Sequence, residues 1–205
     1  MKKYLFLVFF TAIGIFSQVL ADSPLTSTDI SKAYQKEQIV QLAAATKGRL
    51  TPMLMDYLYE KKNPIEVKIA VINQLGWDTN GKNNSEIFFQ YLSGKSGYKS
   101  TDDLLSNASA DILICMAYLK ALDNYFEVDE AIEWAITAKI KNKKSYTIQM
   151  IAALIEAQKA MDSDWCKVYQ LANDVRINKA LKKDMKDEAI TLIFEYMELY
   201  KDECK

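Results

Sequence analysis

Apolar residues in the second half of the chain recur at the spacing of an α-helix. Two quartets take the offsets 0, 3, 4 and 7: Ile148, Ile151, Ala152 and Ile155, then Ile190, Ile193, Phe194 and Met197. That spacing places each quartet on one face of a helix. Alternation of apolar and polar residues, the pattern of a strand, nowhere extends beyond four or five residues. The pattern therefore predicts an all-α protein.

Residues that interrupt helices are concentrated in the first half. The last proline is Pro64 and the last glycine is Gly97, so residues 98–205 contain neither type. A sheet-rich region of that length needs turns that contain glycine or proline. Start and stop signals predict about nine helices, with a break near Asn107 in the fifth. Their ranges are roughly 29–47, 52–62, 64–75, 85–93, 101–122, 128–140, 145–161, 164–176 and 185–203.

The N-terminus has the layout of a secretory signal peptide. Lys2 and Lys3 precede an apolar stretch of 12 residues, Leu5 to Phe16, and a small residue, Ala21, ends the next segment. An uncleaved membrane anchor is the alternative, but spanning a bilayer takes about 20 apolar residues. We expect residues 1–21 to be a signal peptide and residues 22–205 to be one α-helical repeat domain. The protein is then exported, either periplasmic or secreted.

Charge and cysteine content narrow the functions that this chain can have. Cleavage after Ala21 leaves 24 Lys and Arg against 27 Asp and Glu, a net charge of −3. Such a balance gives no general attraction to nucleic acid or to anionic membranes. No later segment is long and apolar enough to span a membrane. The chain has no histidine, so catalysis by an imidazole and zinc ligation by an imidazole are excluded, and we expect no cofactor or metal.

The three cysteines are expected to differ in role. Cys115 lies inside an apolar helical pattern and is predicted to be buried. In an oxidising compartment Cys166 and Cys204 are then the plausible disulfide pair. No spacing among the three is typical of a metal site.

Residues 110–141 resemble a tetratricopeptide repeat. Cys115 takes the position of the small residue at which paired helices touch, Tyr118 follows three positions later, and Ala131 and Ala138 lie seven apart in the second helix. The segment departs from the family by four extra residues between the helices, by Asp111 in place of a large apolar residue, and by lacking a closing proline. The earlier hairpin, residues 64–93, resembles a HEAT unit as much as it resembles a tetratricopeptide repeat. The resemblance implies a right-handed stack of antiparallel helical hairpins, an α–α superhelix. A compact helical bundle is the alternative.

The resemblance also implies a binding groove lined by the first helix of each hairpin. The residues expected to be exposed there are Ser109, Met116 and Lys120 from one unit, and Tyr146, Gln149 and Glu156 from the next. Trp134 and Trp165, on second helices, are expected to fill gaps between hairpins. The predicted function is a non-enzymatic module that binds an unknown protein or peptide. One alternative is a small periplasmic inhibitor or immunity protein against a toxin or a cell-wall enzyme. The other is a carboxylate-dependent hydrolase of glycans or peptidoglycan that uses Glu130 and Glu133.

Charges are separated between the two kinds of turn. The turns between predicted hairpins are basic, with Lys139, Lys141, Lys143 and Lys144 in one and Lys179, Lys182 and Lys183 in the next. The two groups lie 40 residues apart, so stacking places them along one rim. Lysines at helix ends also complement the helix dipole, each by about 0.3–1 kcal/mol. Both interpretations, dipole complementation and a basic rim for an acidic partner, stay open.

Overall fold

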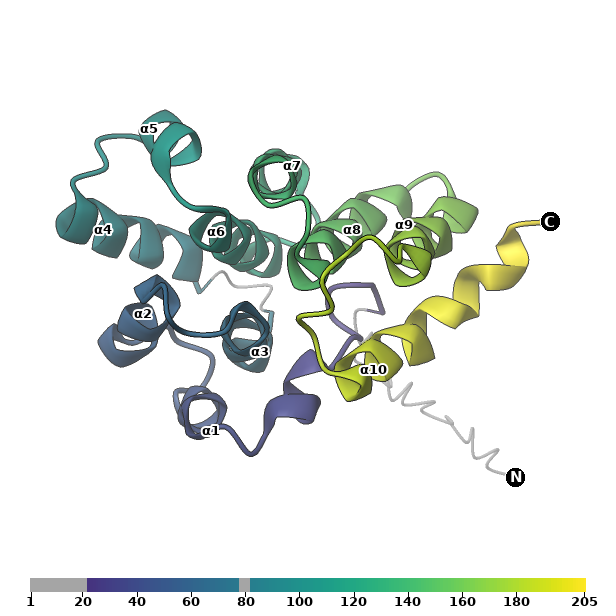
Figure 1. The fold of residues 1–205 in the computed structure, drawn as a ribbon, viewed down its shortest axis with the longest axis horizontal. Helices are drawn as coiled ribbons and strands as arrows, with labels where there is room; N and C mark the ends of the chain where they lie inside the picture. Colours follow the sequence, from purple (N-terminus) through teal and green to yellow (C-terminus); the bar gives the residue numbers. More distant parts are fainter. Residues whose placement is uncertain (1–21, 78–81) are drawn as a thin grey trace, which may run out of the picture.

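The computed structural model describes residues 22–77 and 82–205, and this part of the chain is all-α, as predicted. The signal peptide predicted for residues 1–21 lies outside the described residues. The described residues form ten α-helices and two 3-10 helices and no strand (Figure 1). The first six elements are η1 (Ile30–Tyr34), α1 (Gln38–Ala45), α2 (Pro52–Tyr59), α3 (Ile65–Leu75), α4 (Asn84–Ser96) and α5 (Thr101–Asn107). The last six are α6 (Ala110–Asp123), α7 (Asp129–Lys141), α8 (Tyr146–Ala160), α9 (Trp165–Ile177), α10 (Asp187–Met197) and η2 (Glu198–Glu203).

Side-chain caps explain why several helices begin where they do. Ser100, Ser109, Ser145 and Asp164 each accept a hydrogen bond from a backbone N–H in the first turn of the following helix. These bonds satisfy N–H groups that have no partner within the helix. The expected break near Asn107 is confirmed: α5 ends at that residue, and Ser109 caps the start of α6.

Helices α6 and α8 lie in the middle of the molecule. Helix α7 packs against both of them, and α3 contacts both as well (Figure 1). Eleven of the 14 residues of α6 and eleven of the 15 residues of α8 are buried. Since α3, with eight of its 11 residues buried, lies against these first helices of the two hairpins, they do not form an open inner wall.

A buried hydrogen-bond network holds α3 against α6. The amide of Asn73 donates to the Tyr118 hydroxyl at 2.8 Å and to the Thr28 carbonyl at 2.9 Å. The same side chain accepts from the Ser31 backbone N–H at 2.8 Å. One residue of α3 therefore fixes both α6 and the segment before η1, which keeps the N-terminal helices over the hairpins.

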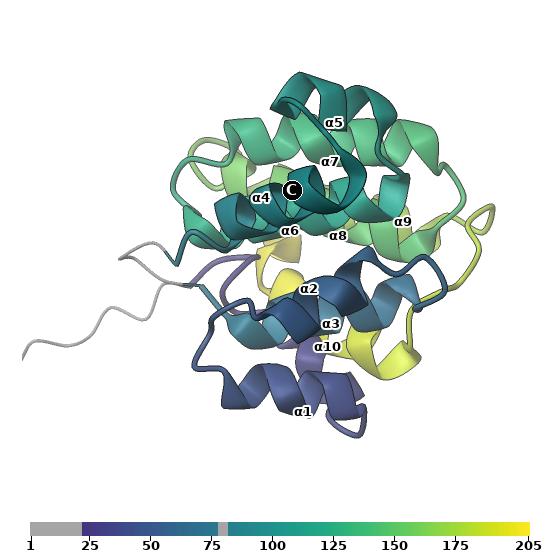
Figure 2. The same ribbon diagram turned by 90° about the vertical axis from the view of Figure 1, so that its left-hand side faces the viewer.

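The beginning and the end of the described chain also meet. The backbone N–H of Lys186 donates to the Tyr34 hydroxyl at 3.0 Å, and the Lys186 ammonium lies 4.4 Å from the centroid of the Tyr34 ring. This contact ties η1 to the start of α10 (Figure 2). It also explains why the helix predicted over residues 29–47 is divided into η1 and α1, because Tyr34 is held by a residue far along the chain.

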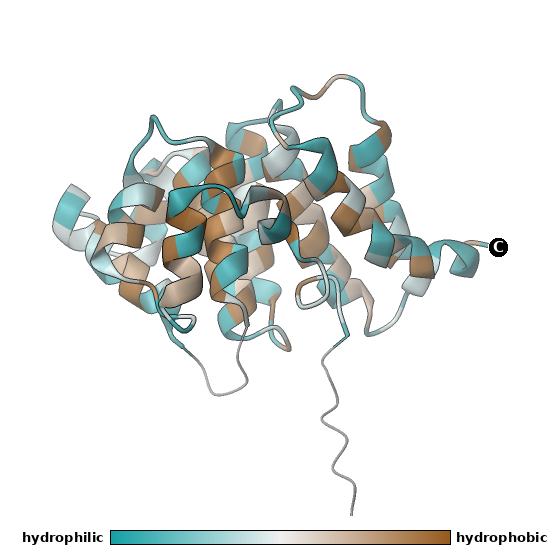
Figure 3. Ribbon diagram, turned by 90° about the horizontal axis from the view of Figure 1, so that it is seen from below, coloured by the Kyte–Doolittle hydropathy of each residue, from teal (hydrophilic) through white to brown (hydrophobic). Residues whose placement is uncertain are grey.

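The helices carry their apolar residues in stripes alternating with hydrophilic positions (Figure 3). The buried apolar residues form one continuous core. Among the described helices none has the length and apolar content needed to cross a bilayer.

Candidate functional site

A groove separates the C-terminal half of α9 from α10. It consists of two adjoining cavities of about 470 and 440 Å³, which share Arg176 and Ile190. The first is also lined by Thr191, Phe194, Glu195 and Glu198, and the second by Tyr146, Asn178, Lys179, Leu181, Lys183 and Asp187. The groove thus has an apolar middle, an acidic end near η2 and a basic end at the segment between α9 and α10. Such a mixture of apolar wall and a few polar groups is typical of binding sites.

Arg176 is held rigidly in the wall of this groove. Its guanidinium lies 3.9 Å from the centroid of the Phe194 ring and forms an ion pair with Glu198 at 2.8 Å. It also donates to the Tyr169 hydroxyl at 2.9 Å and to the Asn173 side-chain oxygen. Stacking on an aromatic ring together with several charge-assisted hydrogen bonds fixes a guanidinium well. The groove wall is therefore preformed.

Tyr146, at the start of α8, contributes a hydroxyl group with no partner. The residue is 6% exposed, and its hydroxyl has no hydrogen bond to any described residue. Burial raises the pKa of Tyr146 to about 12, although the positive charge of Arg176 acts in the opposite direction. The hydroxyl therefore stays protonated at neutral pH and remains a donor. A buried polar group without a partner is uncommon and calls for an explanation.

Replacing Tyr146 by phenylalanine is expected to stabilise the protein by about 1 kcal/mol, because it removes a desolvated hydroxyl that makes no hydrogen bond. Urea unfolding followed by far-UV circular dichroism measures the effect. Tyr118→Phe is the matched control: its hydroxyl accepts from Asn73, so its loss should destabilise. A Tyr146→Phe variant less stable than the parent protein would show that the hydroxyl has a structural partner.

The two basic turns predicted to lie on one rim are joined by backbone hydrogen bonds. The Lys182 N–H donates to the Lys144 carbonyl at 2.6 Å, and the Tyr146 N–H donates to the Lys182 carbonyl at 3.1 Å. We call residues 142–145 and 178–183 the joined basic turns. Their lysines are all exposed: Lys143, Lys144, Lys179, Lys182 and Lys183. This basic surface borders the groove, because Lys179 and Lys183 line its second cavity.

A further cavity lies at the turn between α6 and α7. Its volume is about 380 Å³, and Lys120 lines it together with several carboxylates. Lys120 forms an ion pair with Glu130 at 2.8 Å. Glu133, the other residue of the carboxylate alternative, is exposed. No group of three or more acidic or cysteine side chains suited to a metal ion occurs within residues 22–77 and 82–205.

The six residues predicted to line one groove do not share a surface. Met116 is 2% exposed, so its predicted exposure is wrong; the core formed around α6 encloses it. Ser109 caps α6, and Gln149 donates to the Lys139 and Asn142 carbonyls. Glu156 pairs with Lys139 at 2.8 Å, while Lys120 lies at the turn between α6 and α7. Only Tyr146 reaches the groove, and it is a buried part of the wall and not an exposed contact.

The groove was not predictable from the sequence because its walls come from α9 and α10, which do not belong to one predicted hairpin. Arg176 and Ile190 carry no motif, and only the cluster of lysines at 179–183 was a usable signal.

The prediction for the two tryptophans was half right. Trp134 is 1% exposed, whereas Trp165 is 53% exposed and lies beside Tyr200 with a centroid distance of 5.9 Å.

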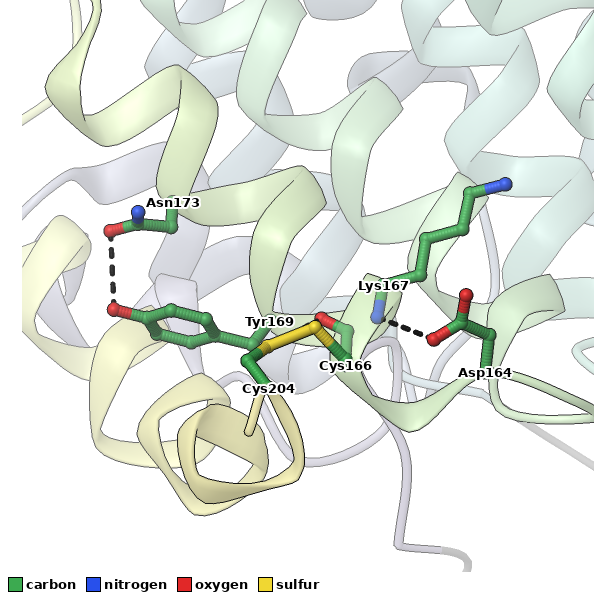
Figure 4. Close-up of a disulfide and its surroundings, with 6 residues drawn as sticks. All are labelled: Asp164, Cys166, Lys167, Tyr169, Asn173 and Cys204. Atoms are coloured by element: carbon green, nitrogen blue, oxygen red, sulfur yellow. Dashed lines mark hydrogen bonds between the residues drawn. A yellow bond between two sulfur atoms is a disulfide. The ribbon is translucent and has the colours of Figure 1, made fainter.

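Cys166 and Cys204 form a disulfide, which attaches the end of η2 to the first turn of α9 (Figure 4). Cys115 is a free, buried cysteine, and burial raises its thiol pKa to about 12. Next to the disulfide, Tyr169 donates to the side-chain oxygen of Asn173, the residue that also accepts from Arg176. The disulfide is therefore connected to the acidic end of the groove.

Comparisons with protein-family models, with curated proteins and with solved structures give no match to this chain.

Proposed function

We propose that this protein is an exported interaction module that holds an extended segment of a partner protein in the groove between α9 and α10. The observation that carries the proposal is the preformed groove wall, in which Arg176 is fixed by Phe194 and Glu198 beside the apolar Ile190. A wall that is already ordered loses little conformational entropy when a ligand binds. Lysines at one end and glutamates at the other can fix the direction of the bound segment.

We further propose that α6 to α9 are two tetratricopeptide-like hairpins whose inner face is covered by the protein's own N-terminal helices. The close packing of α6 with α7 and of α8 with α9 supports this view. Partner binding then moves from the inner face to the end of the stack, where α9 meets α10. Export is supported by the disulfide, since such bonds persist in oxidising compartments. The first residues after the proposed cleavage site belong to the folded part of the protein, since Ser23 and Leu25 are buried.

Selection of displayed peptides tests this function. A library of random dodecapeptides on phage is selected against the purified protein, and enriched peptides are measured by fluorescence anisotropy. Thr191 is exposed and lines the groove, so Thr191→Trp fills the groove without disturbing the core. We expect this variant to weaken binding of the enriched peptides by at least about tenfold.

Thr101→Trp is the matched control, because Thr101 is equally exposed but lies on α5, away from the groove (Figure 1). It should bind the peptides as the parent protein does. Enriched peptides that bind Thr191→Trp with the same affinity as the parent protein would contradict the proposed site. A selection that enriches no peptide would contradict the proposed function.

A further inference from the structure

The lysines of the joined basic turns are not explained by helix capping. Helix α7 ends at Lys141 and α9 ends at Ile177, so residues 143–144 and 179–183 lie outside both helices. Lys179 to Lys183 instead precede α10, whose N-terminus carries the positive end of the helix dipole. Cations there are unfavourable, and the effect of the α7 and α9 C-termini fades within one turn. The dipole therefore does not explain Lys182 and Lys183, because they follow α9 by more than one turn and lie close to the start of α10.

Few of these lysines are neutralised by the protein itself. Lys183 forms an ion pair with Asp187, and Lys144 donates to the Ala180 carbonyl. Lys143, Lys179 and Lys182 have no ion pair with any residue in the described part of the chain. This concentration of positive charge stands out in a chain whose formal net charge is −1. A local field of this kind attracts a negatively charged partner.

The basic surface is continuous with the groove. Lys179 and Lys183 line the same cavity as the apolar Ile190 and Leu181. Asp187 also lines it and pairs with Lys183, so the Lys179 ammonium is the cation there that no carboxylate of the described residues pairs with. Ammonium groups donate charge-assisted hydrogen bonds to carboxylates.

We propose that the segment bound in the groove is an acidic peptide, with apolar side chains against Ile190 and Phe194 and carboxylates on the joined basic turns. This inference rests on the proposed function and specifies its partner. A peptide fits better than a nucleic acid, because the Glu195 carboxylate at the far end of the groove repels a uniformly charged polyanion.

Two labelled nonapeptides test the proposal: fluorescein-Ala-Glu-Leu-Glu-Glu-Leu-Ala-Glu-Leu, and the same peptide with glutamine at every glutamate. Anisotropy with the purified full chain at low salt should show at least about tenfold tighter binding of the glutamate peptide. Substitution of Lys143, Lys179 and Lys182 by glutamine should weaken binding of the glutamate peptide roughly tenfold and reduce the salt dependence of its binding.

The matched control substitutes Lys61, Lys62 and Lys99 by glutamine. These residues are exposed, and the control changes the net charge by the same amount as the test variant. It should bind both peptides as the parent protein does. Equal loss in both variants would show that only overall charge matters and would overturn the inference.

Other outcomes separate this inference from the proposed function. If the glutamine peptide binds as tightly and Thr191→Trp abolishes its binding, the groove stands and the acidic partner is wrong. If neither peptide binds, the acidic partner is wrong, and the peptide selection alone decides whether the groove binds another segment. Tighter binding of a dodecamer of thymidylate, or of phosphatidylserine vesicles, than of the glutamate peptide would assign the basic surface to nucleic acid or membrane and overturn the inference.

Discussion

Asp111→Asn is expected to lower the free energy of unfolding by about 3 kcal/mol, the lower end of the cost of breaking a buried ion pair. Lys68 is 0% exposed, and its ammonium has no hydrogen-bond acceptor among the described residues. Its ion-pair partner is Asp111, at 3.9 Å across the contact between α3 and α6. Removal of the carboxylate leaves an uncompensated charge in the core. We place the effect at the lower end because the Asp111 side chain is 29% exposed and water reaches it.

Lys68→Met separates loss of the charge from loss of the pair. Methionine fills a similar volume without an ammonium group, so we expect Lys68→Met to be neutral or stabilising and to rescue Asp111→Asn. Asp129→Asn, which breaks an exposed ion pair with Lys159, is the control and should cost under about 1 kcal/mol. Urea unfolding of all four variants would contradict this account if Asp111→Asn and Asp129→Asn cost the same.

The helices were predictable because their determinants are local. Apolar periodicity and the caps at Ser109, Ser145 and Asp164 act within a few residues of each helix start. The division of residues 29–47 was not predictable, because it depends on the contact of Tyr34 with Lys186, more than 150 residues away. Local rules identify helices well, but they do not show which helix a distant side chain interrupts.

The inner face of the two hairpins is covered by α3 for a physical reason that the sequence does contain. Helix α3 has apolar residues on nearly all sides, and a helix of that kind is buried on several faces. It therefore needs a neighbour on each side, and the first helices of the hairpins supply one. The joined basic turns were visible as two groups of lysines, but the backbone bonds between Lys144 and Lys182 depend on tertiary structure.

Of the changes considered, loss of the disulfide is expected to lower the free energy of unfolding the most. Cys166 and Cys204 are separated by 38 residues, and closing a loop of that length restricts the unfolded chain by about 4 kcal/mol. Substitution of both cysteines by serine should therefore lower the free energy of unfolding by about that amount. Urea unfolding of the purified protein gives the value, and reductant added to the parent protein should reproduce it.

The double serine variant itself provides the control, because reductant should not change its stability further. Cys115 is buried and unpaired, so it should react with a thiol reagent only on unfolding and should not account for a reductant effect.

The folded variant should also loosen at η2, whose remaining attachments include the pair of Tyr196 and Tyr200 hydroxyls at 2.6 Å and the ion pair of Arg176 with Glu198. Since Glu198 lines the groove, the rate of hydrogen exchange in η2 and the rate of peptide dissociation should both be higher in the variant than in the parent protein. Unchanged stability in reductant would show that the two cysteines are not paired in the purified protein.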